Sequence, residues 1–345
     1  MRLILAGFGT VGQAFAQLLL QKEKELAVAH GLVPRVVAVA DSSGSESDGR
    51  GLDLAAVLRQ KRKTGSLAPT GGAGAGRRPT TTAEVIEKVD ADVLVETTPT
   101  NFKSGEPGLT HIRAAFISRK HVVTSNKGPV GVAFQALHEL ARHNQVQFRY
   151  SGAVGGGTPV LGFGKTCSLG DDITRVTGIL NGTCNFILTT MEREGVEFDV
   201  ALRRAQAEGY AERDPTLDVE GFDSAVKLTI IANHLGLNRA TVGDVSVAGI
   251  SGVTSAEVRR ARDRGKALRL GATADGALSV APVLLSREDP LCISGAYNAV
   301  KFDCRFSGPK VIVGKGAGGP ETASSLLRDL IEVRAEVAAA GGSER

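Results

Sequence analysis

Carboxylates and a lysine crowd the stretch ERDPTLDVEGFDSAVKL, residues 212–228. On a helix that begins near Gly221, Asp223 and Lys227 are four residues apart and share one face. In an arbitrary helix such a pair is a solvated ion pair that contributes little to stability. Here the helix continues as LTIIANHLGL, which is apolar enough to be largely buried. The pattern therefore disfavours a solvated pair here, and the nearby carboxylates favour the charged form of Lys227.

A second lysine, Lys127, lies in TSNKGP directly after an apolar strand. Because α/β proteins bind ligands beyond the carboxyl ends of parallel strands, its ammonium is expected to project toward that crevice. NGTCN, at 181–185, precedes a helix that Thr183 can cap, and its asparagines either line a pocket or only shape the turn. Asp214 and Asp218 are weaker candidates for binding a substrate or supporting residues that bind it.

The glycines of GFGTVG follow the GxGxxG pattern, with a strand (2–6) before them and a helix after them. Gly7 permits a tight turn, Gly9 lets the backbone approach a pyrophosphate, and Gly12 lets helix pack on strand. The helix N-terminus then offers unpaired N–H groups to phosphates. A glycine-rich turn without a ligand is the alternative, but Asp41 at the end of the second strand favours a dinucleotide.

The choice between NAD and NADP stays open. Asp41 is expected to accept the ribose hydroxyls of NAD and to repel the extra phosphate of NADP. Four cations nearby can reach such a phosphate: Arg50, Lys61, Arg62 and Lys63. Thr97 and Thr98, in ETTPTN at the end of a mid-sheet strand, either hydrogen-bond the cofactor or only form the turn.

The elements that must position these residues fall into two domains. Strands at 2–6, 35–40, 92–96, 121–125 and 146–150 alternate with helices, which predicts a parallel sheet. We expect a dinucleotide-binding domain of residues 1–150 with 308–345, interrupted by a mobile polar insertion at 42–80. After the glycine hinge SGAVGGGTP, residues 151–307 are expected to form an α+β domain. The arginines at 259–269 suggest a solvated helix face.

Composition excludes several classes of protein. The net charge of +4 and the 4% of aromatic residues do not favour nucleic-acid binding. No apolar run is long enough to cross a membrane and the N-terminus does not read as a signal peptide, so a cytoplasmic protein is expected. The four cysteines form no metal-binding pattern, and the histidines fall in no paired catalytic spacing.

The ordered motifs GFGTVG, TSNKGP, AVGGGTP, ILNGTCNFIL, GYAERDP, GFDSAVKL and a late GAGG run resemble homoserine dehydrogenase over nearly the whole chain. The resemblance implies a Rossmann domain joined to an α+β catalytic and dimerisation region, in the short form without an ACT domain. It implies interconversion of L-homoserine and L-aspartate 4-semialdehyde with NAD or NADP, in threonine and methionine biosynthesis, by a homodimer.

The resemblance also implies roles for single residues. Lys227 would transfer the proton and Lys127 would assist beside the nicotinamide, while Glu212, Asp223 and Asp218 would bind the substrate. The residues implied to contact the cofactor are Gly7, Phe8, Gly9, Thr10, Val11, Gly12, Asp41, Thr97, Thr98, Lys127, Gly316 and Gly318.

One position departs from the family pattern. Many members carry a glutamate ligand for a monovalent cation where this chain has Ser151. Backbone carbonyls around Val154, Gly156 and Thr158 could still bind Na⁺, but a glycine hinge that binds no ion explains the motif equally well. Two other functions remain as alternatives: another NAD(P)-dependent semialdehyde or amino-acid dehydrogenase, and a non-catalytic NAD(P) sensor. A semialdehyde dehydrogenase with a nucleophilic cysteine is disfavoured because Cys184 has no evident base.

Overall fold

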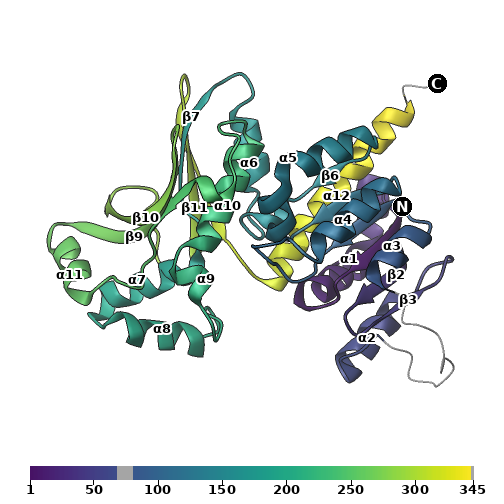
Figure 1. Ribbon diagram of the computed structural model, residues 1–345, viewed down its shortest axis with the longest axis horizontal. Coiled ribbons are helices and arrows are strands. Elements are labelled where there is room, and N and C mark those ends of the chain that lie inside the picture. The colour runs from purple at the N-terminus through teal and green to yellow at the C-terminus, as the bar shows by residue number, and fades with distance from the viewer. Residues whose placement is uncertain (68–80, 343–345) are drawn as a thin grey trace. The chain divides into compact units, whose positions relative to one another are not determined.

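The structure is a computed structural model that describes residues 1–67 and 81–342. The chain divides into two compact units, Met1–Ala153 with Gly318–Arg345, and Val154–Ala317. Each unit contains one six-stranded sheet (Figure 1). No helix in the described ranges combines the length and apolarity needed to cross a bilayer.

The first unit confirms the predicted parallel sheet. Its strands run in the order β3-β2-β1-β4-β5-β6, and only β3 is antiparallel to its neighbour. The strands are β1 (Arg2–Ala6), β2 (Arg35–Asp41), β3 (Gly44–Ser47), β4 (Val93–Glu96), β5 (His121–Thr124) and β6 (Phe148–Arg149). The helices are α1 (Thr10–His30), α2 (Leu54–Thr64), α3 (Thr82–Lys88), α4 (Gly108–Ile117), α5 (Lys127–His143), η1 (Ser151–Ala153) and α12 (Gly319–Gly342).

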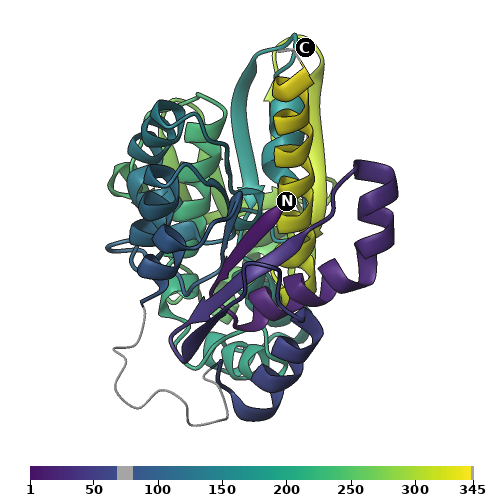
Figure 2. The same ribbon diagram turned by 90° about the vertical axis from the view of Figure 1, so that its right-hand side faces the viewer.

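Helices cover both faces of this sheet. Helix α12 packs beside α1 on one face, whereas α3, α4 and α5 lie on the other (Figure 2). The central strands β1 and β4 are buried along their whole length apart from the first residue of β1, as expected for strands covered on both sides. The carboxyl ends of β1, β4 and β5 therefore meet at one edge, where the glycine loop, ETTPTN and TSNKGP follow them.

The described part of the predicted insertion, residues 42–67, forms a strand and a helix that belong to the first unit. Strand β3 pairs with β2, and α2 buries Leu54, Val57 and Leu58 in the core of this unit together with Leu67. Three apolar side chains at helical spacing outweigh the polar composition around them. The rest of the predicted insertion, 68–80, lies outside the described residues.

The second unit builds a mixed sheet in the order β12-β11-β7-β9-β10-β8. Its strands are β7 (Ile173–Ile179), β8 (Val245–Val247), β9 (Lys266–Ala274), β10 (Leu278–Ser286), β11 (Tyr297–Cys304) and β12 (Gly308–Lys315). Its helices are α6 (Val160–Cys167), α7 (Gly182–Glu194), α8 (Phe198–Ala207), α9 (Thr216–Val219), α10 (Phe222–His234), η2 (Val242–Asp244) and α11 (Ser255–Asp263). Helices α7 and α10 pack on the sheet.

Two boundaries in this region differ from the sequence expectation. Strand β12 pairs along its whole length with β11, so residues 308–317 belong to the second unit rather than to the dinucleotide-binding domain. The arginine-rich helix ends at Asp263, and Arg269 lies in β9 with 1% of its surface exposed. The expected solvated face therefore does not include Arg269, whose Nη1 donates to Glu192 Oε2 at 2.8 Å inside the unit.

Candidate functional site

The glycine loop has the shape that a pyrophosphate requires. Gly7 has a φ of +87°, and a Cβ there would lie 2.6 Å from the carbonyl carbon of Thr97. A Cβ on Gly12 would lie 2.3 Å from the carbonyl oxygen of Gly7. By contrast, a Cβ on Gly9 would meet no heavy atom within 4 Å. The loop is therefore closed toward the protein and open at Gly9, beside the N-terminus of α1, where anions bind.

The other residues of this loop differ in what they expose. Phe8 is fully buried. Thr10 is exposed and Val11 is half-buried at the start of α1. Gly319 lies beside Thr10, because a Cβ there would be 3.0 Å from Thr10 Cγ2. The neighbouring Gly318, directly before α12, therefore lies close to the glycine loop.

Asp41 is already paired at the end of β2. Lys61 of α2 places Nζ 2.7 Å from Asp41 Oδ2, and Ser43 donates its backbone N–H and its hydroxyl to Oδ1. Burial alone would raise the pKa of Asp41, but the hydrogen bonds from Lys61 and Ser43 hold it below its usual value. The position predicted to read the ribose therefore carries a lysine together with the carboxylate. Of the four cations that the sequence offered for a 2′-phosphate, Lys61 is the one that contacts Asp41.

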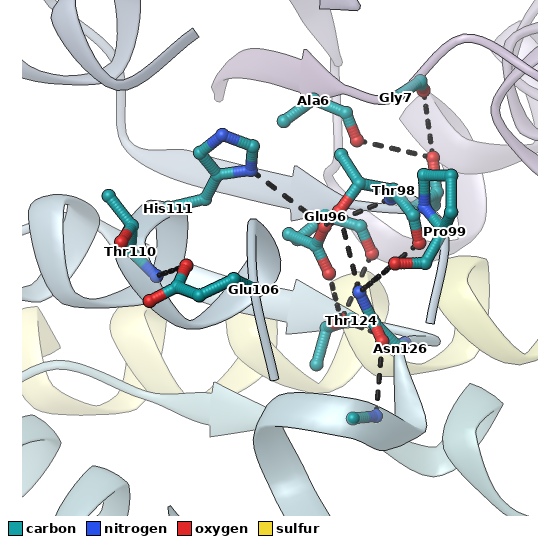
Figure 3. A network of polar contacts seen from close by, with 12 residues as sticks. Ala6, Gly7, Glu96, Thr98, Pro99, Glu106, Thr110, His111, Thr124 and Asn126 are labelled. Carbon is teal, nitrogen blue, oxygen red and sulfur yellow. Dashed lines mark hydrogen bonds and ion pairs between the residues drawn. The ribbon is translucent and has the colours of Figure 1, made fainter. Parts of the chain in front are cut away.

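Thr97 and Thr98 act in different ways. Thr97 donates its hydroxyl to the carbonyl oxygen of Gly7 at 2.8 Å, which ties the end of β4 to the glycine loop. Thr98 donates its backbone N–H and its hydroxyl to the buried carboxyl of Glu96 (Figure 3). Both threonines thus have a structural bond, which agrees with the interpretation that they form the turn and leaves a cofactor contact as a prediction.

Lys127 is the first residue of α5. Asn126 caps the helix by accepting a hydrogen bond from Gly128 N at 3.1 Å. The Lys127 ammonium lies 6.0 Å from the centre of the Phe102 ring, and the residue as a whole is half-buried. Lys127 therefore lies where the sequence predicted it, at the carboxyl edge of the sheet.

In the second unit, Asp223 and Lys227 form a buried pair. Lys227 Nζ lies 2.7 Å from Asp223 Oδ2, and the two side chains are 8% and 9% exposed. Lys227 also donates to the carbonyl oxygen of Leu180 at 2.8 Å, just beyond β7. The expectation of a buried pair on one helix face is therefore confirmed.

Asn181 joins this pair to Asp218. Its amide Nδ2 lies 2.6 Å from Asp218 Oδ1 and 3.0 Å from Asp223 Oδ2. Its Oδ1 accepts from Cys184 N and so caps α7. The cap is therefore Asn181 and not Thr183, whose hydroxyl donates to the carbonyl oxygen of Tyr210. The sequence did not single out Asn181, because an asparagine before a helix can cap that helix or line a pocket and the sequence pattern is the same in both cases.

Asn298 is a residue that sequence reasoning missed. It lies in β11, donates Nδ2 to the same Leu180 carbonyl at 2.9 Å, and is 4% exposed. Gly316 leaves room for it, since a Cβ there would lie 2.0 Å from Asn298 Nδ2. The role of Gly316 in the structure is thus to admit Asn298 within the second unit. No motif surrounds Asn298 that could have identified it from the sequence.

Glu212 stands apart from the buried group. Its side chain is exposed, and its backbone carbonyl accepts from Gln206 Nε2 at 3.1 Å. The structure therefore brings Asp218, Asp223 and Lys227 together around Asn181, while Glu212 lies on the outer surface of the same unit.

The three residues named for Na⁺ lie at the start of the second unit. Val154 and Thr158 are buried, and Gly156 has a φ of +56°. The Thr158 carbonyl already accepts from Val160 N at 2.8 Å. Across the described ranges, no group of three or more His, Cys, Asp or Glu side chains could hold a metal ion. A sodium site made of backbone carbonyls stays a prediction.

Two family models match the chain. The model described as the homoserine dehydrogenase NAD-binding domain matches residues 7–151, and the model described as homoserine dehydrogenase matches residues 159–331. The homoserine dehydrogenase of Methanocaldococcus jannaschii is 42% identical over 335 residues, which are 96% of this chain and 98% of that protein. An NAD(+)-dependent homoserine dehydrogenase of Pseudomonas canavaninivorans is also 42% identical, over 96% of both chains.

Solved structures agree with these matches. A provisionally named homoserine dehydrogenase from Archaeoglobus fulgidus has a TM-score of 0.89 at 41% identity and covers 97% of this chain and 99% of that one. A hyperthermophilic archaeal homoserine dehydrogenase in complex with NADPH has a TM-score of 0.84 at 28% identity, over 97% and 98% of the two chains. The dinucleotide loop, the buried Asp–Lys pair and these full-length matches agree, and the chain belongs to the homoserine dehydrogenase family.

Proposed function

We propose that this protein interconverts L-homoserine and L-aspartate 4-semialdehyde by hydride exchange with NAD(H) or NADP(H). The observation that carries the proposal is the hydrogen bonding of Lys227. An ammonium has three N–H donors. Asp223 and the Leu180 carbonyl take two of them, at 2.7 and 2.8 Å, which leaves one for the oxygen of a substrate.

This arrangement suits a proton transfer in either direction. The cofactor exchanges a hydride with the carbon that bears the reacting oxygen. During reduction, Lys227 gives its third proton to the forming alkoxide. The neutral amine that results still donates to Asp223 and Leu180, and its lone pair points where the proton was. During oxidation the same lone pair accepts the hydroxyl proton, so that direction is favoured at higher pH.

The carboxylates around Lys227 would bind the ammonium of the amino acid. Asn181 has a single NH₂ group between Asp218 and Asp223, which holds the two carboxylates near each other. Glu212, exposed on the same unit, would add a third negative charge at the entrance. Lys127, in the first unit beyond β5, would assist beside the nicotinamide.

Either cofactor fits the residues at the end of β2. An acid at the end of the second strand, as Asp41 is, accepts the ribose hydroxyls in NAD-binding proteins, which favours NAD. Lys61 offsets its charge at 2.7 Å and can bind a 2′-phosphate, which makes NADP acceptable. The named relatives include an NAD(+)-dependent enzyme and one in complex with NADPH, so family membership alone does not select between them.

A dehydrogenase with a cysteine nucleophile is a poorer fit. Cys184, beside the acidic group, is fully buried. Burial, followed by the charges of Asp218 and Asp223, raises the pKa of its thiol well above the ordinary value. Since the thiolate is the nucleophile, this cysteine is unsuited to covalent catalysis.

The decisive experiment measures formation of NADH and NADPH from L-homoserine with each oxidised cofactor, from neutral to alkaline pH. L-serine and L-threonine serve as control alcohols. Homoserine-dependent reduction that Lys227→Met abolishes and Lys301→Met preserves is the expected outcome. Cofactor binding without turnover at any pH would reject the enzyme and favour the sensor, and faster turnover of a control alcohol would favour a different dehydrogenase.

We further propose that the protein is a cytoplasmic homodimer. Supporting this, two paired strands at one edge of the second sheet expose Tyr297 in β11 and Val313 in β12, at 47% and 50%. Exposed apolar side chains that gather on one surface mark protein interaction sites. Light scattering on the purified protein tests the assembly, and a monomeric mass at micromolar concentration would contradict it.

A further inference from the structure

Glu96 is a buried acid that the proposed chemistry does not use. It ends β4 and has none of its surface exposed. A buried carboxyl costs free energy unless hydrogen bonds replace its water. Oε1 accepts from Thr98 N at 2.9 Å and from the Thr98 hydroxyl, while Thr124 Oγ1 lies 2.9 Å from Oε2 (Figure 3).

These bonds belong to a closed ring. Thr124 Oγ1 accepts from Asn126 N at 3.0 Å, and Asn126 Nδ2 donates to the carbonyl oxygen of Thr98 at 3.1 Å. The ring therefore runs from Glu96 through Thr124 and Asn126 to Thr98 and back to Glu96. It connects the ends of β4 and β5, two strands that pair directly.

The ring includes the residues that set the position of Lys127. Asn126 precedes Lys127 and caps α5, so its backbone N–H and its side chain are both engaged. Gly108 packs tightly against both side chains, since a Cβ there would lie 2.7 Å from Asn126 Nδ2 and 3.3 Å from Glu96 Cδ. A shift of Glu96 would thus move both Thr98 and the start of α5.

We propose that Glu96 is a positioning residue, whose carboxyl sets the places of Thr98 and Lys127 at the cofactor edge of the sheet through this ring. The proposal rests on the proposed function, because it gives Lys127 a task beside the nicotinamide. Glu96 acts through its neighbours and touches neither substrate nor cofactor. Its contribution lies in geometry, and displacing a reacting group by about 1 Å can cost a factor of 100 in rate.

Position 124 gives the cleanest test. Thr124→Val keeps the shape but leaves Asn126 N and Glu96 Oε2 without their partner, whereas Thr124→Ser keeps the hydroxyl. We expect kcat to fall about 10- to 100-fold in the valine variant and less than about 3-fold in the serine variant, with little change in KM for homoserine. Equal losses in both variants, or wild-type kcat in Thr124→Val, would overturn the proposal.

Position 96 tests the ring independently. A glutamine can still accept from Thr98 and can donate to the Thr124 hydroxyl, which is free to turn toward the Glu96 carbonyl, 3.0 Å away. We therefore expect Glu96→Gln to stay within about 5-fold of wild type and Glu96→Ala to lose at least about 30-fold in kcat. A glutamine variant as weak as the alanine variant would show that charge, and not ring geometry, is required. If Glu96→Ala does not fold, the pair at position 124 decides.

The matched control is Thr190→Val, which changes a buried threonine in α7 of the other unit, and it is expected to keep wild-type kcat. Hydrogen exchange in 96–108 and 124–130 provides a readout that needs no substrate, and Thr124→Val should speed it in both segments together. Faster exchange in one segment alone would break the ring model. If wild-type protein does not oxidise homoserine, the proposed function fails while the exchange result still tests the ring.

Discussion

Replacing Lys227 by methionine separates the contribution of its ammonium group from that of its apolar side-chain packing. Methionine keeps the unbranched apolar stem and removes the donor to Asp223 and to the Leu180 carbonyl. The partners are not left bare, because Asn298 still donates to Leu180 at 2.9 Å and Asn181 to Asp223 at 3.0 Å. The substitution should therefore leave the unit folded, and loss of activity can be assigned to the missing ammonium.

The expected size of the effect follows from the role of Lys227. A positioned acid–base group contributes about 100- to 10,000-fold to a rate. At about 1.4 kcal/mol per factor of ten, this corresponds to about 3 to 5 kcal/mol of transition-state stabilisation. Because the first unit holds the cofactor loop, the Kd for NADH or NADPH should stay within about 3-fold of wild type.

Initial rates of both directions, followed by the absorbance of the reduced nicotinamide across a pH series, provide the assay. Lys227→Met should slow both directions at every pH, because it removes the group that exchanges the proton. Lys301→Met should keep wild-type rates, since it removes a lysine from a half-buried pair of β11. A Lys227→Met enzyme with kcat within about 10-fold of wild type and the same pH profile would refute the reasoning.

Three further predictions follow from the same structure. Glu212→Gln should raise KM for homoserine about 10-fold with kcat nearly unchanged, because it removes a charge-assisted contact; an unchanged KM would argue against ammonium recognition. Lys61→Met should lower the NADP-to-NAD ratio of kcat/KM about 10-fold, because Asp41 loses its cation at 2.7 Å; an unchanged ratio would remove Lys61 from cofactor selection. Burial raises the pKa of Asp329 to about 6, so the folded protein retains a proton that the unfolded chain releases, and stability falls as the pH rises from about 4 to 6. Asp329→Asn, which keeps an acceptor for Ser151 N, should therefore gain up to about 3 kcal/mol over wild type above pH 6 and little below pH 4, measured by urea unfolding at both pH values.

Much of the first unit could be predicted because its signals are local. Buried parallel strands form continuous apolar runs, and GxGxxG names a turn that the chain must make between β1 and α1. The expectation failed where long-range packing opposed local composition. Arg269 follows an arginine-rich helix, yet it is buried because its guanidinium pairs with Glu192, 77 residues away in the sequence.

For the site, the sequence determined which groups are present and which of them share a helix face. Asp223 and Lys227 meet because an α-helix brings residues four apart together, and no tertiary contact is needed for that. The tertiary structure alone decided what Lys227 does with its protons. Leu180, 47 residues away, takes one of them, and Asn298, 118 residues from Leu180, shares that carbonyl. These partners meet Lys227 only because the helix packs on the sheet. The order of residues in the sequence does not reveal which residues that packing brings together.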